Sequence, residues 1–304
     1  MSELNQSEGD FHGNQTRIID NGHIQLEYLA FSPRIVRMRM AGNDNLFADL
    51  GNEKIPTPYG DFSFRGGHRL WHSPESMPRT YVPDVTGVSI TSVPGGVRFD
   101  QPAEQWTNIA KSMEIHFTEG KPQVIIQHEL RNEGAWAVEL SVWALTMFKL
   151  GGVAILPQPV GNTDPAGLLS NRFLTIWPYT NLLDPRLILR SDCILIKSDP
   201  KATPESSPVK LGYFNPQGWE AYWIDKVLFV KRFDVIPDVL YPDKGCNAES
   251  YCNHKFIELE SLSPLVKLQP EETISHSETW ELFSSLDQLF IPEEIREIIK
   301  GFNK

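Results

Sequence analysis

The chain has 304 residues, of which 40% are hydrophobic and 22% charged, so it is long enough to bury a large core without disulfide cross-links. The formal net charge of -11 argues against the basic surface that a nucleic-acid backbone requires, and it disfavours anionic membranes. No stretch approaches the roughly 18 apolar residues of a membrane span, so neither nucleic acid nor membrane is expected as a partner.

The N-terminal residues 1–15 are polar and contain no apolar segment of the secretory type, so we predict a disordered tail. The chain contains three cysteines, Cys193, Cys246 and Cys252. An odd number without framework spacing is typical of a reduced, cytoplasmic protein, and we expect free thiols.

From residue 16 onward, short runs of alternating apolar and polar residues are separated by turn residues, a pattern typical of antiparallel strands. The strands predicted in the first half are 22–31, 34–42, 87–93, 96–102, 112–120 and 122–132. Those predicted in the second half are 137–148, 172–179, 193–199, 209–214, 220–225, 226–233, 255–264 and 274–283. Turns are expected at Pro94–Gly96 and Glu119–Pro122.

A single helix is predicted, over residues 291–302, where apolar residues recur at helical spacing behind Pro292. The fold class is therefore all-β: one large antiparallel β-sandwich over residues 16–304 with a short C-terminal helix. Two separate domains are the alternative.

The stretch GGHRLWHSPE, residues 66–75, concentrates side chains suited to chemistry. Arg69 has the guanidinium fork that binds a carboxylate or phosphate, and Trp71 can stack on a sugar ring. His68 and His72 have a spacing used by zinc ligands, on a helix or on one strand face. No nearby cysteine or third histidine completes a ligand set, so no metal and no cofactor are expected. The alternative is a loop whose tryptophan packs in the core.

Two glutamates, Glu258 and Glu260, lie two residues apart in a predicted strand and therefore share one face. Carboxylates this close raise each other's pKa, which is useful in a base and costly in a core. The alternative is a solvated strand face with two surface charges.

The segment 243–253 before this strand is predicted to be a loop. It offers the polar groups of Asp243, Asn247 and Glu249 to a ligand, although an ordinary loop has a similar composition. Lys210 and Lys231 flank an aromatic cluster and could neutralise an acidic sugar.

The C-terminal part, with FIELESLSP, LQPEE and SHSETWELF, resembles the galactose mutarotase-like superfamily, which includes aldose 1-epimerases and hexose-6-phosphate epimerases. Glu271 stands where the family's turn usually has glycine. The segment VELSVWALTMFKLGGVAILPQ resembles the family's central strands, with Trp143 where a histidine is usual. The likeness covers most of the chain in architecture but only the last third in motif, as for an uncharacterised branch.

The resemblance implies an epimerase in which Glu260 is the catalytic base and either His68 or His72 is the acid. Mutarotation needs such a pair, because one group deprotonates the anomeric hydroxyl while another protonates the ring oxygen. The binding residues would be Arg69, Trp71, Trp143, Asp243, Asn247, Glu249 and Glu258. The partner would be a small sugar, and the protein a monomer or homodimer. Because Trp143 replaces a histidine, a non-catalytic sugar-binding module is an alternative, as is a glycan lyase on the same fold.

Overall fold

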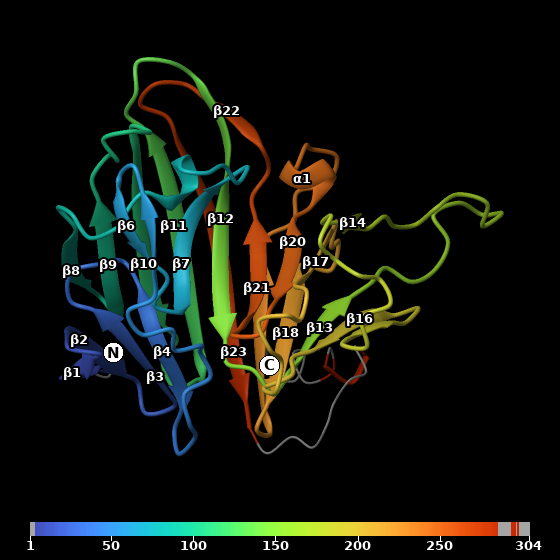
Figure 1. The fold of residues 1–304 in the computed structure, drawn as a ribbon, viewed down its shortest axis with the longest axis horizontal. Coiled ribbons are helices and arrows are strands. Elements are labelled where there is room, and N and C mark those ends of the chain that lie inside the picture. The colour runs from blue at the N-terminus through green and yellow to red at the C-terminus, as the bar shows by residue number, and fades with distance from the viewer. Residues whose placement is uncertain (1–3, 285–292, 296, 298–304) are drawn as a thin grey trace.

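The computed structural model describes residues 4–284, 293–295 and 297. Two large antiparallel sheets pack face to face (Figure 1), which confirms the predicted β-sandwich. The eleven-stranded sheet has the order β1 (Asn5–Phe11), β2 (Asn14–Asp20), β3 (Ile24–Leu29), β4 (Ile35–Met40), β7 (Gly67–Ser73), β12 (Val138–Phe148), β21 (Ile257–Leu262), β20 (Ala248–Cys252), β17 (Val209–Tyr213) and β14 (Thr175–Ile176), with β22 (Val266–Leu268) paired to β12.

The ten-stranded sheet has the order β15 (Leu187–Leu189), β16 (Cys193–Lys197), β13 (Val153–Pro157), β18 (Trp219–Ile224), β19 (Val227–Phe233), β23 (Thr273–Phe283), β11 (Gln123–Asn132), β10 (Ile109–Phe117), β9 (Gly96–Gln101) and β8 (Ser89–Val93). A separate hairpin consists of β5 (Lys54–Thr57) and β6 (Gly60–Ser63). A 3-10 turn covers Arg79–Tyr81, and α1 covers Pro242–Gly245.

The main core lies between the two large sheets, where alternate residues of each strand interdigitate. In β10 and β9, for example, Met113, Ile115 and Phe99 are almost fully buried on the inner face. Burial of each such side chain stabilises the fold by about 1.5–3 kcal/mol. Both sheets contribute to this one cluster.

Two segments outside the strands predicted from the sequence are strands in the structure. Residues 67–73 form β7 and residues 248–252 form β20, both inside the eleven-stranded sheet. Every residue of β7 is buried, because the second sheet covers one face and loops cover the other. A strand buried on both faces loses the apolar–polar alternation that sequence reading depends on. Conversely, only 175–176 of the strand predicted over 172–179 has strand pairing.

The N-terminal segment differs from the prediction of a disordered tail, because residues 5–11 form β1. This strand pairs with β2 along its full length. Its side chains are mostly exposed, so backbone hydrogen bonds rather than buried apolar area hold it on the sheet edge. Composition does not reveal such an edge strand.

Much of the predicted C-terminal helix lies outside the described residues. Residues 293–295 and 297 are helical, and Ile295 is fully buried against the outer face of the ten-stranded sheet. Within the part of the chain that the structure describes, no helix is long and apolar enough to cross a membrane.

Candidate functional site

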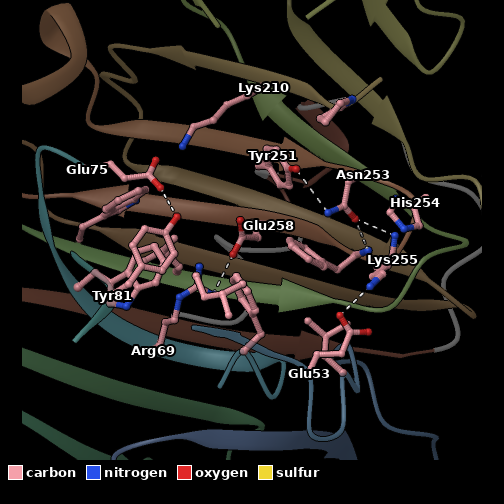
Figure 2. Close-up of a pocket in the computed structure, with 18 of the residues that line it drawn as sticks. Glu53, Arg69, Glu75, Tyr81, Lys210, Tyr251, Asn253, His254, Lys255 and Glu258 are labelled. Atoms are coloured by element: carbon pink, nitrogen blue, oxygen red, sulfur yellow. Dashed lines mark hydrogen bonds and ion pairs between the residues drawn. The ribbon is translucent and has the colours of Figure 1, made fainter. Parts of the chain in front are cut away.

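A cavity of about 510 Å³ lies over the outer face of the eleven-stranded sheet, at its centre. Its floor consists of side chains from β7, β12, β21, β20 and β17, and loops form its walls (Figure 2). The strand alternation decides which side chains reach it, because residues two apart share a face. Arg69 and Trp71 of β7, Trp143 of β12 and Glu258 of β21 all face the cavity.

The central feature of the floor is an ion pair between Arg69 and Glu258, whose Nη1 and Oε1 atoms are 3.0 Å apart. Both residues are more than nine-tenths buried. The Arg69 guanidinium also lies over the indole of Trp71, 4.1 Å from the ring centre. The ion pair lacks hydrogen-bond alignment, so Glu258 Oε1 has no hydrogen-bond partner.

The environment of Glu258 makes it a proton-exchanging group near neutral pH. Burial raises the pKa of its carboxyl, Arg69 lowers it, and Glu260 raises it again, with a net pKa of about 7. A carboxyl with this pKa can give and take a proton at physiological pH.

At the cavity wall, Lys210 of β17 joins two buried carboxylates. Its Nζ lies 2.8 Å from Glu249 and 3.0 Å from Glu260. Although burial opposes the charge, these carboxylates hold the pKa of Lys210 well above its usual value. The ammonium also lies over the indoles of Trp143 and Trp177.

Glu260 is therefore held from two sides, since Trp143 Nε1 donates a hydrogen bond of 2.9 Å to the same carboxylate oxygen that Lys210 contacts. It is fully buried and is not among the residues that line the cavity. Glu249 is likewise fully buried, and burial raises the pKa of its carboxyl well above the usual value.

Aromatic side chains complete the walls. Tyr81 donates a hydrogen bond to Glu75 and packs edge-on against Trp71 (Figure 2). Tyr179 and Tyr251 make an edge contact on the side where Lys210 lies. Burial raises the pKa of all three tyrosines, so their phenols stay protonated and can donate hydrogen bonds.

One histidine lines the cavity within the described residues, and it is His254, which the sequence reading did not select. It is partly exposed in the loop between β20 and β21. Its neighbour Lys255 pairs with Glu53 at 2.6 Å across the rim (Figure 2). Its position in the sequence could have identified it, because His254 directly follows the polar segment 243–253 and precedes the strand that contains Glu258 and Glu260.

The structure does not bring His68 and His72 to this cavity, contrary to the expected acid role. Both alternate with Arg69 and Trp71 on β7, so their side chains enter the interior between the sheets. His68 Nε2 lies 2.8 Å from His128 Nε2, and His68 Nδ1 lies 2.9 Å from Thr146 Oγ1. His72 Nε2 lies 3.8 Å from Glu104.

His68 and His72 do not form a shared zinc site. They lie on the same strand face, but each contacts different residues between the sheets. Among the described residues, the group with metal-ligand spacing is instead His68, His128 and Glu278, whose ligand atoms lie within 4.8 Å of one another. Lys231 Nζ pairs with Glu278 at 2.8 Å, and Ser261 and Trp280 also donate to this carboxylate. A cluster satisfied in this way, with an ammonium inside it, does not need a metal.

Two further predicted binding residues have structural partners. Asn247 is fully buried and forms hydrogen bonds with the backbone N–H and C=O of Asn215, which hold the chain after β17. Asp243 lies in α1, where burial raises the pKa of its carboxyl. Neither lines the cavity. Lys231, suggested as a partner for an acidic sugar, is fully buried between the sheets.

Known structures with this fold are numerous. A candidate aldose 1-epimerase from Klebsiella pneumoniae aligns with 100% of this chain and 88% of its own, at a TM-score of 0.58 and 10% identity. A candidate mutarotase from Salmonella typhimurium aligns with 93% of this chain and 96% of its own, at 0.55 and 11%. The chain therefore has the galactose mutarotase-like fold.

The same fold occurs as part of a longer protein. A TPR-domain-containing protein from Parabacteroides distasonis aligns with 91% of this chain at a TM-score of 0.61 and 9% identity, and this chain spans about half of its length, 48%. Neither the models of protein families nor the sequences of characterised proteins match this chain. At these identities, the likeness concerns the fold alone.

Proposed function

We propose that the cavity binds an uncharged aldose and interconverts its two anomers, with Glu258 as the general base. The observation that carries this proposal is the state of Glu258: its carboxyl lines the cavity, is 5% exposed, and has a pKa of about 7. One of its oxygens lacks a hydrogen bond and can accept one from a ligand hydroxyl.

In the proposed reaction, Glu258 takes the proton of the anomeric hydroxyl. The C1–O5 bond of the ring then breaks, C1 becomes an aldehyde carbon, and a general acid delivers a proton to O5. After rotation about the C1–C2 bond, the same steps run in reverse and close the ring in the other anomer. We assign the general acid to His254, because imidazole suits proton transfer near neutral pH and His254 lines the same cavity.

The choice of Glu258 over Glu260 follows from access. Glu260 is fixed by Lys210 and Trp143 and does not line the cavity, whereas Glu258 does. The role proposed for Glu260 is electrostatic, since its charge favours the protonated form of Glu258. The indoles of Trp71 and Trp143 provide apolar surfaces against which a sugar ring can pack.

An uncharged ligand is favoured because the cavity offers no spare arginine or lysine. Among the residues that line it, Arg69 is paired with Glu258, Lys255 with Glu53, and Lys210 with two carboxylates. A sugar phosphate or uronate would have to break one of these pairs. Arg69 and Lys210 are therefore not available to neutralise an acidic sugar.

Exchange spectroscopy by nuclear magnetic resonance tests the proposal. The protein is mixed with glucose, galactose, glucose 6-phosphate or glucuronate, and anomer exchange is compared with buffer alone. We expect acceleration for at least one uncharged aldose and much less for the two anions. The Glu258→Gln variant should abolish the acceleration, and Glu139→Gln, at an exposed position of β12, is the matched control.

A non-catalytic sugar-binding module is the second candidate, favoured by Trp143 at the position where the family usually has a histidine. Titration calorimetry with the same sugars separates the two. Binding without any acceleration of anomer exchange would support the module and exclude the epimerase.

A further inference from the structure

A segment on the side of the sandwich opposite β1, residues 158–192, is called the arm here. It connects β13 to β16 and contains the short strands β14 and β15. Figure 1 shows part of it, in yellow-green, projecting beyond the sheets near β14 and β16. The proposed epimerase chemistry does not explain this projection.

The arm exposes an unusual amount of apolar surface. Leu168 is 84% exposed, Leu169 67%, Leu182 50% and Leu183 88%. More than half of the large exposed hydrophobic side chains in the described part of the chain belong to the arm; the others in it are Val160, Phe173, Ile176, Tyr179 and Leu189. Scattered single residues of this kind are normal on a protein surface, but a concentration in one segment marks an interaction site.

The two Leu-Leu pairs are presented by turns that are fixed in place. The carboxylate of Asp164 accepts hydrogen bonds from the backbone N–H groups of Ala166 and Leu169, at 3.1 and 2.9 Å. The side-chain oxygen of Asn181 accepts one from the N–H of Leu183 at 3.0 Å. Because these hydrogen bonds order the backbone of both turns, the leucine side chains remain exposed to solvent.

The base of the arm is attached to the body of the protein. Within the arm, Asn171 donates a hydrogen bond to the carbonyl of Gly161 at 2.8 Å, and Arg172 donates one to the carbonyl of Ser191 at 2.7 Å. Toward the body, Thr180 donates one to the carbonyl of Lys210 at 2.9 Å. Thr175 donates one to the carbonyl of Asp243 at 3.1 Å. The apolar side chains are therefore held on a defined scaffold before any partner arrives, which lowers the entropic cost of association.

The charge of the arm differs from that of the rest of the protein. The chain as a whole carries -11, whereas the arm contains three aspartates and three arginines and no other charged residue. Two of these arginines are paired within the arm, Arg186 with Asp184 and Arg190 with Asp192. Two copies of this acidic protein would repel each other least if they met through this neutral segment.

The arm also supplies a free edge of both sheets, because β14 is the last strand of the eleven-stranded sheet and β15 the last of the ten-stranded one. The opposite edge, β1, has the sequence NQSEGDF and is polar and acidic. Polar and charged edges resist pairing with other chains, whereas apolar edges promote it.

We propose that the arm is the interface of a homodimer, in which the Leu-Leu turns of one copy pack against the arm of the other. Each partner contributes about 800 Å² to a standard interface, and the arm offers nine large apolar side chains that are 41% to 88% exposed. A cationic partner or an anionic membrane would call for a surface with net charge, whereas the charges of the arm balance. The proposal is independent of the sugar chemistry.

Analytical ultracentrifugation of the full chain from about 1 to 100 μM, a range that brackets micromolar dissociation constants, tests the proposal. We expect a mass of twice the 34.5 kDa of one chain at the higher concentrations. The variant carrying Leu168→Ser, Leu169→Ser, Leu182→Ser and Leu183→Ser should be a monomer over the whole range. Trp136→Ser is the matched control, since Trp136 is 84% exposed outside the arm and its loss should leave the dimer intact.

The four leucines are exposed, so the variant should keep the circular dichroism spectrum and melting temperature that the monomer has. Hydrogen exchange on the wild type gives a second measurement, with protection of residues 160–190 rising with protein concentration. A monomeric wild type at 100 μM, including one that sediments with uncharged phospholipid vesicles, would overturn the proposal. So would a four-leucine variant that dimerises as the wild type does.

Discussion

The inner and outer faces of the central strands both contain buried charged side chains, but the hydrogen bonding of these side chains differs between the faces. On the inner face, His68, His128 and Glu278 belong to a network whose members have hydrogen-bond partners in the opposite sheet. On the outer face, Glu258 and Arg69 border a cavity and keep atoms without hydrogen-bond partners. A saturated polar network stabilises a fold, whereas an unsaturated one beside a cavity is available to a ligand.

The buried polar groups of the inner face link the two sheets. Lys231 reaches from β19 to the backbone carbonyl of Leu259 in β21, and Ser261 of β21 donates to Glu278 of β23. Residue type alone would favour the inner face as the catalytic site, since it contains His68, His72, His128 and His276. Access to the cavity favours the outer face instead. Unpaired atoms alone do not decide, because His72 Nε2 on the inner face also lacks a hydrogen-bond partner.

The largest expected effect comes from Glu258→Gln. If the outer face does the chemistry, removal of the base lowers the rate of anomer exchange by about 10²–10⁴-fold, the usual contribution of acid–base catalysis. The substitution is isosteric, so the melting temperature provides the folding check. An unchanged rate in a folded variant would contradict the assignment of the chemistry to the outer face.

The next largest effect is on stability and concerns the inner face. Glu278→Gln leaves the buried ammonium of Lys231 without its counter-ion, which costs about 3–5 kcal/mol of unfolding free energy. Urea denaturation at pH 7 measures it. The exchange rate per folded molecule should stay the same, and a selective loss of rate with normal stability would assign chemistry to the inner face.

The pH dependence sharpens the outer-face assignment. Because Glu258 must be ionised to act as a base, kcat/KM should rise with pH through a midpoint of about 7. Arg69 favours the ionised form, so in Arg69→Gln the pKa of Glu258 rises and the midpoint moves up by about one unit or more. If the midpoint does not move in this variant, the group whose titration controls the rate is not Glu258.

The smallest expected effect on rate is that of His68→Asn. This change removes the contact with His128 and costs about 1–3 kcal/mol of stability through the unpaired buried group. The rate and its pH midpoint should stay as in the wild type, while His254→Gln should lower the rate. The reverse pattern would restore His68 as the acid.

The sequence by itself determined the architecture and part of the site. Period-two alternation and turn residues predicted the β-sandwich, because a strand with one covered face keeps that pattern in its residues. The common face of Glu258 and Glu260 followed from their spacing. Arg69, Trp71 and Trp143, which the sequence predicts as binding residues, line the cavity.

Only the tertiary structure decided which face of β7 meets the cavity. A strand covered on both sides has no apolar–polar contrast, so the sequence of residues 67–73 cannot tell the side of His68 from the side of Arg69. The same limit applies to Glu260, whose access depends on Lys210, fifty residues earlier in the chain. Burial, partners and access arise from contacts between distant segments. They are the reason that the proposed base is Glu258 instead of Glu260, and the proposed acid His254 instead of His68 or His72.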